Sequence, residues 1–176
     1  WLSTHHATSP GCWCVTWKKA SGRPKLPYDD LVEEALSVGW VDSLPRALDA
    51  DRSMLLVTPR KPRSVWSAAN RARVARLEAA GLLLPAGAAV IAAARADGSY
   101  DALAKVEAAG IPADLQAAFR RHRGSATAFD GFAPSVRKGI LQWLASAKRA
   151  ETRAERVERI ARMAGRGLRA NYDREG

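Results

Sequence analysis

Residues 28–44, YDDLVEEALSVGWVDSL, decide the fold. The first part predicts a helix over 28–38, because Asp29 and Asp30 stand in a first turn that favours negative charge and Gly39 follows as a helix stop. The apolar positions that share one side of this helix are Leu31, Ala35, Leu36 and Val38. The end of the stretch turns at once from helical to β-type residues, so helices and strands alternate here.

Three short stretches predict β-strands. Cys12–Lys18 alternates two sets of side chains, with Trp13, Val15 and Trp17 on one face and Cys12, Cys14 and Thr16 on the other. Trp40–Leu44 predicts a second strand, which ends at Pro45, and Ser53–Thr58 predicts a third. The connections are hairpin-length or helical, so we expect an α+β fold with a small, mostly antiparallel sheet and covering helices.

The rest of the chain is helical in pattern. Glycine and proline divide residues 64–176 into helices over roughly 64–80, 85–97, 99–109, 112–122, 134–148 and 151–164. We expect an α+β module over residues 1–84 and a helical, basic C-terminal module over 85–176, and the two may equally pack as one domain. No fixed-period repeat is visible.

Composition excludes disorder and a membrane span. Of the 176 residues, 47% are hydrophobic and 26% are charged, as in ordinary globular proteins. The longest mostly apolar stretch, 82–94, is interrupted by Pro85 and Gly87, and a spanning helix needs about 20 apolar residues. Cys12 and Cys14 lie too close for a comfortable disulfide, so we expect a reducing, cytoplasmic location, with a removed export signal left open.

Positive charge gathers in the last third of the chain. Residues 120–176 hold 14 Lys/Arg and 6 Asp/Glu, whereas residues 1–119 hold 14 and 12, within a net charge of +10. Helical spacing favours Glu155–Arg159 and Glu158–Arg162 pairs, and it leaves His122 at a solvated helix end. The less compensated cations, which form a candidate anion or nucleic-acid patch, are Lys148, Arg149, Arg153 and Arg156.

Signatures of common catalytic sites are absent from the sequence. It has no glycine-rich phosphate loop, dinucleotide fingerprint, Gly-x-Ser-x-Gly elbow or His-Glu-x-x-His pair. We therefore name no catalytic residue and expect no cofactor. His5, His6, Cys12 and Cys14 invite a metal interpretation, but their spacing fits known ligand patterns poorly, and a free Cys is more often a small buried hydrophobe. We expect no metal site.

One amide on a predicted helix points to a possible binding site. In the helix over 64–80, with Ser64 as N-cap, Asn70 shares an apolar face with Trp66, Val74 and Leu77. Burying an amide without partners costs about 1–3 kcal/mol, so we expect Asp42 and Arg60, beside strand ends, to pair with it. Asn70 either braces a loop backbone or helps to line an aromatic and polar pocket.

The candidate ligand-binding residues collect around this amide. They are Tyr28, Glu33, Trp40, Asp42, Arg60, Trp66 and Asn70. Adjacent helix residues point about 100° apart, so at most one of Glu33 and Glu34 faces inward. We expect Glu34 to be exposed and leave Glu33 undecided.

The order of several motifs resembles a known family, the YdeI/OmpD-associated or bacteriocin-protection proteins. The motifs are Gly11–Lys19, Tyr28–Asp42, Thr58–Arg60, Ser64–Ser67 followed by Asn70, and Leu141–Arg156. The resemblance implies an α+β N-terminal part, a helical C-terminal part and no established catalytic residues. The sequence departs from the family pattern at Cys12 and Cys14, where the family has aliphatic residues, and at Ser37–Val38.

Three hypotheses about function follow, in order of preference. The first is a non-enzymatic protein of stress or antimicrobial tolerance, which binds a small ligand, peptide or protein partner through the aromatic and polar pocket. The second is a nucleic-acid-associated protein that uses the C-terminal basic face. The third is an enzyme that uses Glu33, Asp42 and Arg60 on a small polar substrate.

Overall fold

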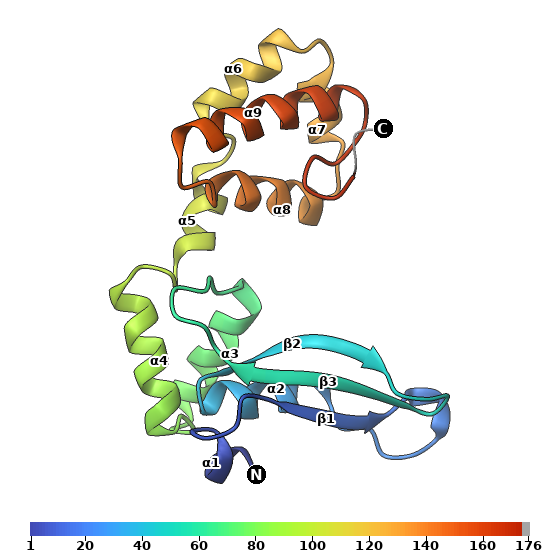
Figure 1. The fold of residues 1–176 in the computed structure, drawn as a ribbon, viewed down its shortest axis with the longest axis vertical. Helices are drawn as coiled ribbons and strands as arrows, with labels where there is room; N and C mark the ends of the chain where they lie inside the picture. The colour runs from blue at the N-terminus through green and yellow to red at the C-terminus, as the bar shows by residue number, and fades with distance from the viewer. Residues whose placement is uncertain (174–176) are drawn as a thin grey trace. The chain divides into compact units, whose positions relative to one another are not determined.

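The structure is a computed structural model that describes residues 1–173, and the chain divides into two compact units (Figure 1). The first unit is Trp1–Ala102 and the second begins at Leu103. This division lies later in the chain than the predicted boundary between residues 84 and 85. The reason is that α4 (Pro85–Ala96) packs its Ile91 and Ala94 into the core of the first unit.

The first unit contains a three-stranded antiparallel sheet, as predicted. Its strands are β1 (Cys12–Trp17), β2 (Trp40–Ala47) and β3 (Arg52–Pro59), in the order β1-β3-β2. The prediction that β2 ends at Pro45 is wrong, because the strand pairs as far as Ala47. Proline is tolerated there since β2 is an edge strand, with a register shift between Asp42 and Leu44.

Helix α2 (Tyr28–Ser37) covers one face of the sheet. Its Ala35 joins Val38, Trp40 and Val57 in a buried cluster, against which Cys12 and Cys14 pack half-buried. The two cysteines are free, and the face of β1 that carries Trp13 and Val15 is exposed. Two short helical turns, α1 (Leu2–His5) and η1 (Lys19–Ser21), flank β1.

Helix α3 (Ala68–Ala79) starts later than the sequence indicates. Ser67, rather than Ser64, is its N-cap, and its hydroxyl oxygen accepts a hydrogen bond from the Asn70 backbone N–H over 3.1 Å. Trp66 therefore lies before the helix, although it is fully buried with Val74 and Leu77 in the core that α2 and α4 share.

A glycine sets how closely α4 approaches α2. A Cβ built on Gly87 would lie 2.2 Å from the backbone oxygen of Ser37, a distance that no side chain could occupy. The N-terminal part of α4 is thereby held directly against the C-terminal end of α2.

The second unit is helical, as predicted. Its helices, which follow α5 (Ala102–Ala109) at the start of the unit, are α6 (Ala113–Arg121), α7 (Ser125–Asp130), α8 (Pro134–Ala145) and α9 (Ala150–Gly165). Val157, Ile160 and Ala164 of α9 lie in its core, and Trp143 of α8 packs against this core. Within residues 1–173, none of the helices is both long and apolar enough to cross a membrane.

Candidate functional site

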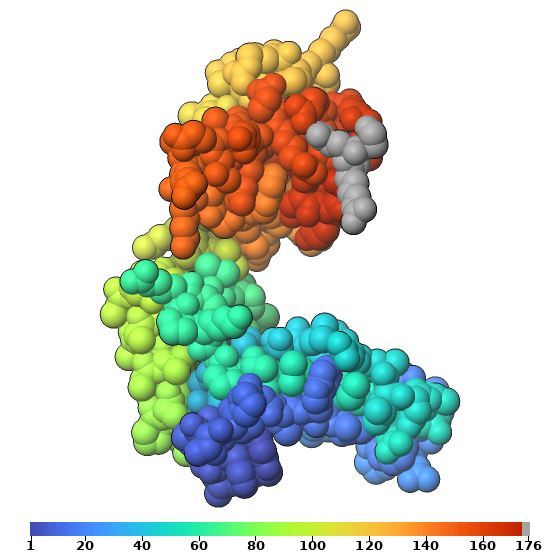
Figure 2. All heavy atoms as spheres, viewed as in Figure 1, coloured from blue at the N-terminus to red at the C-terminus, as the bar shows by residue number. Residues whose placement is uncertain are grey.

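A cleft of about 490 Å³ lies in the first unit. Its walls come from the start of α2, the loop before α2 and the three strands of the sheet. The loop before α2 closes one side of it and forms the blue projection at the far end of the sheet from α4 (Figure 2). The lining residues that the argument uses are Thr16, Lys25, Leu26, Tyr28, Leu31 and Asp42. Its volume and mostly apolar walls are typical of small-molecule sites.

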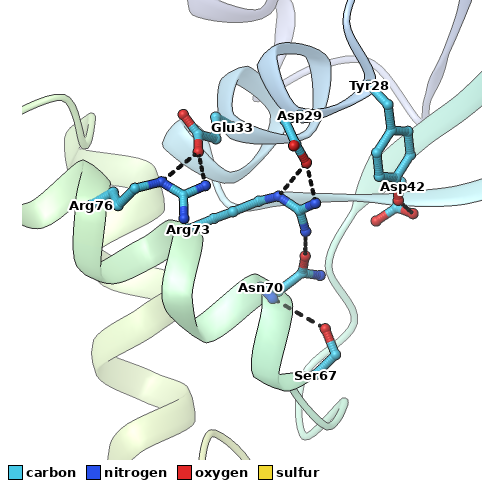
Figure 3. A network of polar contacts seen from close by, with 8 residues as sticks. All are labelled: Tyr28, Asp29, Glu33, Asp42, Ser67, Asn70, Arg73 and Arg76. Carbon is cyan, nitrogen blue, oxygen red and sulfur yellow. Dashed lines mark hydrogen bonds and ion pairs between the residues drawn. The ribbon is translucent and has the colours of Figure 1, made fainter. Parts of the chain in front are cut away.

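One polar pair stands in this cleft. The Tyr28 hydroxyl donates a hydrogen bond of 2.6 Å to a carboxylate oxygen of Asp42, which joins the first turn of α2 to β2 (Figure 3). Burial, together with this bond, raises the pKa of Tyr28 to about 12. Since Tyr28 occupies one carboxylate oxygen, the other keeps acceptor capacity for a ligand.

The cations that line the cleft differ in how free they are. The Lys18 ammonium donates to the backbone oxygens of Asp49 and Ala50 at 2.6 and 3.2 Å, and Arg46 lies 5.5 Å from the Trp13 ring centre. Lys25 makes no side-chain hydrogen bond or ion pair with any residue in 1–173. Of these three cations, Lys25 is thus the one that no contact within residues 1–173 occupies.

The loop before α2 is tied to β1. The backbone N–H of Leu26 donates to the Thr16 hydroxyl oxygen over 3.0 Å, and Leu26 itself is exposed. Leu26 and Lys25 were not among the candidate residues of the sequence, although Leu26 directly precedes Pro27, which favours an extended backbone at Leu26.

Asn70 does not face the cleft, and its expected partners were wrong. Asn70 is buried, and its side-chain oxygen accepts a hydrogen bond of 2.9 Å from Arg73. This bond stands in place of the expected contacts with Asp42 and Arg60. Arg73 in turn pairs with Asp29 on α2 (Figure 3). Asn70 therefore braces an ion pair between two helices. The predicted bracing role holds, but the partner is a side chain and not the backbone of a loop.

Arg60 and Trp66 lie together at a different place in the first unit. The Arg60 guanidinium carbon is 3.7 Å from the Trp66 ring centre, and both residues line a separate cavity of about 120 Å³. This cavity and the Tyr28–Asp42 cleft share no lining residue. The structure thus places Tyr28 and Asp42 at one hollow and Arg60 and Trp66 at another.

Two more candidates lie elsewhere. Trp40 is in the core, where its indole N–H donates to the backbone oxygen of His6 over 3.3 Å. Glu33 forms an ion pair with Arg76 of α3 (Figure 3). Glu34 is exposed, as predicted.

The histidines and cysteines do not converge. The His5 ring stacks on Trp1 with centres 4.7 Å apart, and His6 bonds the backbone oxygen of Leu2. Across residues 1–173, no group of three or more His, Cys, Asp or Glu side chains could hold a metal ion. Burial, and to a smaller extent Cys12, raises the pKa of the Cys14 thiol to about 11, so this thiol is protonated at neutral pH.

The candidate C-terminal patch divides into bound and free cations. Arg153 donates to Asp114 at 2.7 and 3.1 Å, and Arg156 lies over the Trp143 ring while it donates to the Trp143 backbone oxygen. Lys148 and Arg149 are exposed and have no side-chain partner within residues 1–173. Only this pair of the four stays free for an anionic partner in the described part of the chain.

The contacts of His122 and Arg159 correct two expectations about surface charge. The Nε2 atom of His122 lies 2.5 Å from Glu158, which also binds Arg121 over 2.9 Å. His122 is therefore half-buried and paired rather than solvated. Arg159 donates to the backbone oxygens of Ala170 and Asp173, which replaces the expected pair with Glu155.

Two family models match the chain. Residues 1–90, just over half of its length, match the model described as Domain of unknown function (DUF8412). The chain belongs to this family. Residues 108–167 match a second model, described as Bacteriocin-protection, YdeI or OmpD-Associated, which confirms the suspected resemblance for the C-terminal helices. No curated protein and no solved structure matches the chain.

The two models separate the candidate features. The DUF8412 region contains every residue of the Tyr28–Asp42 cleft, whereas the bacteriocin-protection domain contains Lys148, Arg149 and the Arg153–Asp114 pair. The motif Leu141–Arg156 falls within the bacteriocin-protection match, and the motifs between Gly11 and Asn70 fall within the DUF8412 match.

Proposed function

We propose that this DUF8412 protein is a non-enzymatic protein of antimicrobial or stress tolerance, which binds a small ligand or a peptide segment in the Tyr28–Asp42 cleft. The bacteriocin-protection description of residues 108–167 supports the biological role. The observation that carries the binding proposal is an open cleft of about 490 Å³ whose apolar walls surround a single carboxylate, Asp42.

The chemistry of the cleft defines the class of ligand. Leu26 and Leu31 offer apolar contact, and Asp42 offers an acceptor that Tyr28 holds in place. The matching ligand has an apolar body and carries a hydrogen-bond donor or a cationic group toward Asp42. Lys25 at the wall would donate to a carboxylate or another acceptor on the same ligand.

A cell assay tests the role with matched variants. Cells that express Asp42→Asn should lose the tolerance to a bacteriocin that the wild-type protein gives, because the charged acceptor is gone. Glu34→Gln removes the same charge from an exposed position on α2 outside the cleft and should keep full tolerance. Equal tolerance with both variants would contradict the proposal, provided that both proteins melt at the wild-type temperature.

The second candidate function is binding of single-stranded nucleic acid, and the exposed face of the sheet favours it. Trp13 is 37% exposed there, and the guanidinium of Arg46 lies over its ring. Arg23 lies over Trp17 with its guanidinium carbon 4.4 Å from the ring centre. Arginine planes and indole rings on an open sheet can stack bases while the cations meet phosphates.

Binding of a labelled oligothymidine, followed by fluorescence anisotropy, tests this second candidate. Affinity should fall steeply with salt, and Trp17→Ala should weaken binding about tenfold, the usual effect of losing one stacked base. Arg149→Glu, in the free part of the C-terminal patch, is the comparison variant. Loss of binding with Arg149→Glu alone would place the nucleic acid on the helical unit, and no binding at low salt would remove this candidate.

A further inference from the structure

Two residues that line the smaller cavity of the first unit have buried donors without acceptors. It lies between the segment Arg60–Trp66 and the end of α4 with the turn that follows, and its volume is about 120 Å³. Arg60 Nε and Trp66 Nε1 are both buried, and neither has a hydrogen-bond partner within residues 1–173. Trp66 is 0% exposed, so water at the protein surface does not satisfy its N–H.

Such a pair of donors is unusual. More than nine in ten buried polar groups have a partner, and each unpaired one costs about 1–3 kcal/mol. The Arg60 guanidinium is also fixed, because it lies on the Trp66 ring and its Nη1 donates to the Ser64 hydroxyl oxygen and the Val65 backbone oxygen at 3.2 and 3.1 Å. The two free N–H groups therefore belong to one stacked, preorganised unit.

The charge around the cavity is positive. Arg60, Lys61 and Arg63 line it against one carboxylate, Asp97. Asp97 is already engaged, since it accepts the Ser99 backbone N–H over 2.9 Å, and the Ser99 bonds lower its pKa. Burial lowers the pKa of Arg60, and the Asp42 carboxylate opposes this shift only in part. The three cations of the lining therefore outnumber its one carboxylate.

We propose that this cavity binds a small oxyanion of the phosphate class, either inorganic phosphate or the terminal phosphoryl group of a small phosphate monoester. Arg60 Nε and Trp66 Nε1 donate to its oxygens, and Lys61 and Arg63 supply the balancing charge. The volume exceeds the ~30 Å³ share of one water several-fold, which leaves room for a tetrahedral oxyanion. Charge-assisted hydrogen bonds to buried donors are strong enough for specific binding.

This site is separate from the Tyr28–Asp42 cleft, although the Asp42 carboxylate acts on Arg60 through space and raises its pKa against the effect of burial. It shares no lining residue with the Tyr28–Asp42 cleft, so a variant of one leaves the walls of the other intact. Either proposal can therefore fail while the other holds.

The test observes the Trp66 indole N–H directly by ¹H–¹⁵N NMR of the whole chain. Inorganic phosphate and phenyl phosphate are titrated separately, with sodium chloride at matched ionic strength as the reference. We expect a saturable shift of the Trp66 indole resonance with at least one phosphate and no such shift with chloride. Tighter binding of phenyl phosphate identifies a monoester as the ligand, whereas binding of phosphate alone identifies the free ion.

Three variants make the result specific. Trp66→Phe removes the indole resonance and its donor while it keeps a ring for Arg60, and it should weaken phosphate binding, followed by calorimetry, about tenfold. Lys61→Gln, at an exposed position, should also weaken binding, and Lys19→Gln, a cation outside the cavity, should not. No saturable shift with either phosphate, an equal shift with chloride, or equal effects of Lys61→Gln and Lys19→Gln would each overturn the proposal.

Discussion

The phenol of Tyr28 donates a hydrogen bond of 2.6 Å to the carboxylate of Asp42, from the first turn of α2 to the edge strand β2. This contact holds the one carboxylate of the cleft lining in place. It also links the helix and the strand that enclose the cleft.

Tyr28 should ionise late in an alkaline titration. Its pKa of about 12 exceeds the value of about 10 for a free phenol, because burial and the Asp42 carboxylate disfavour the phenolate. A raised pKa in the folded protein means that the stabilisation is full below pH ~10 and is lost as the pH rises toward 12. The difference in tyrosinate absorbance between the wild type and Tyr28→Phe isolates this group, and ionisation near pH 10 would contradict the geometry.

Asn70 should contribute to stability and not to binding. Asn70→Ala removes the acceptor of Arg73 and should destabilise the first unit by about 1–3 kcal/mol in urea unfolding, because a half-buried guanidinium loses a partner. A double-mutant cycle with Arg73→Met should show that the two effects are not additive. Strictly additive effects, or a loss of cleft binding without a loss of stability, would mean that Asn70 acts elsewhere.

Gly87 should tolerate no side chain. The Cβ of Gly87→Ala would meet the Ser37 backbone oxygen, so α4 would have to move and the melting temperature should fall, at a cost of about 1–3 kcal/mol. Gly165→Ala, where a Cβ meets only ordinary contacts at 3.8 Å, is the matched control and should be neutral. Equal melting temperatures for the two variants would show that the approach of α4 to α2 is looser.

The pair of His122 and Glu158 should make the second unit sensitive to acid. The hydrogen bond to His122, and then that to Arg121, lower the pKa of Glu158. A lowered carboxyl pKa in the folded protein means that the stabilisation is present above the unfolded value of ~4.3 and is lost as the pH falls through the folded value. Glu158→Gln should flatten the dependence of the unfolding free energy on pH below ~4.3. If the unfolding free energy of Glu158→Gln depended on pH in this range as that of the wild type does, the His122–Glu158 pair would not be the cause of the acid sensitivity.

The sequence predicted the elements of the fold better than the partners of its side chains. The period-two pattern of β1 and the capped pattern of α2 are local signals, so both elements lie where they were predicted. The prediction that β2 ends at Pro45 was wrong, because an edge strand tolerates a proline. Edge position is a property of the whole sheet and cannot be read from one strand.

In the candidate site too, the sequence predicts contacts within one element better than contacts between elements. Asn70 and Arg73 are three residues apart on one helix, so their contact could have been predicted from spacing alone. The pairing of Arg73 with Asp29, and the meeting of Leu26 with Thr16 and Asp42 at one cleft, depend on how α2 lies against the sheet. No local pattern encodes that placement.

The most direct test of the central claim is a ¹H–¹⁵N NMR titration with benzamidine, which joins an apolar ring to a cationic pair of donors. The account predicts saturable shifts of the Leu26, Tyr28, Leu31 and Asp42 amides, with affinity about tenfold weaker for Asp42→Asn, because a charge-assisted bond is lost, and unchanged for Glu34→Gln. Neutral benzamide should bind more weakly than benzamidine. Shifts that avoid these four amides, or equal affinities for the two variants, would contradict the claim that this cleft is a binding site.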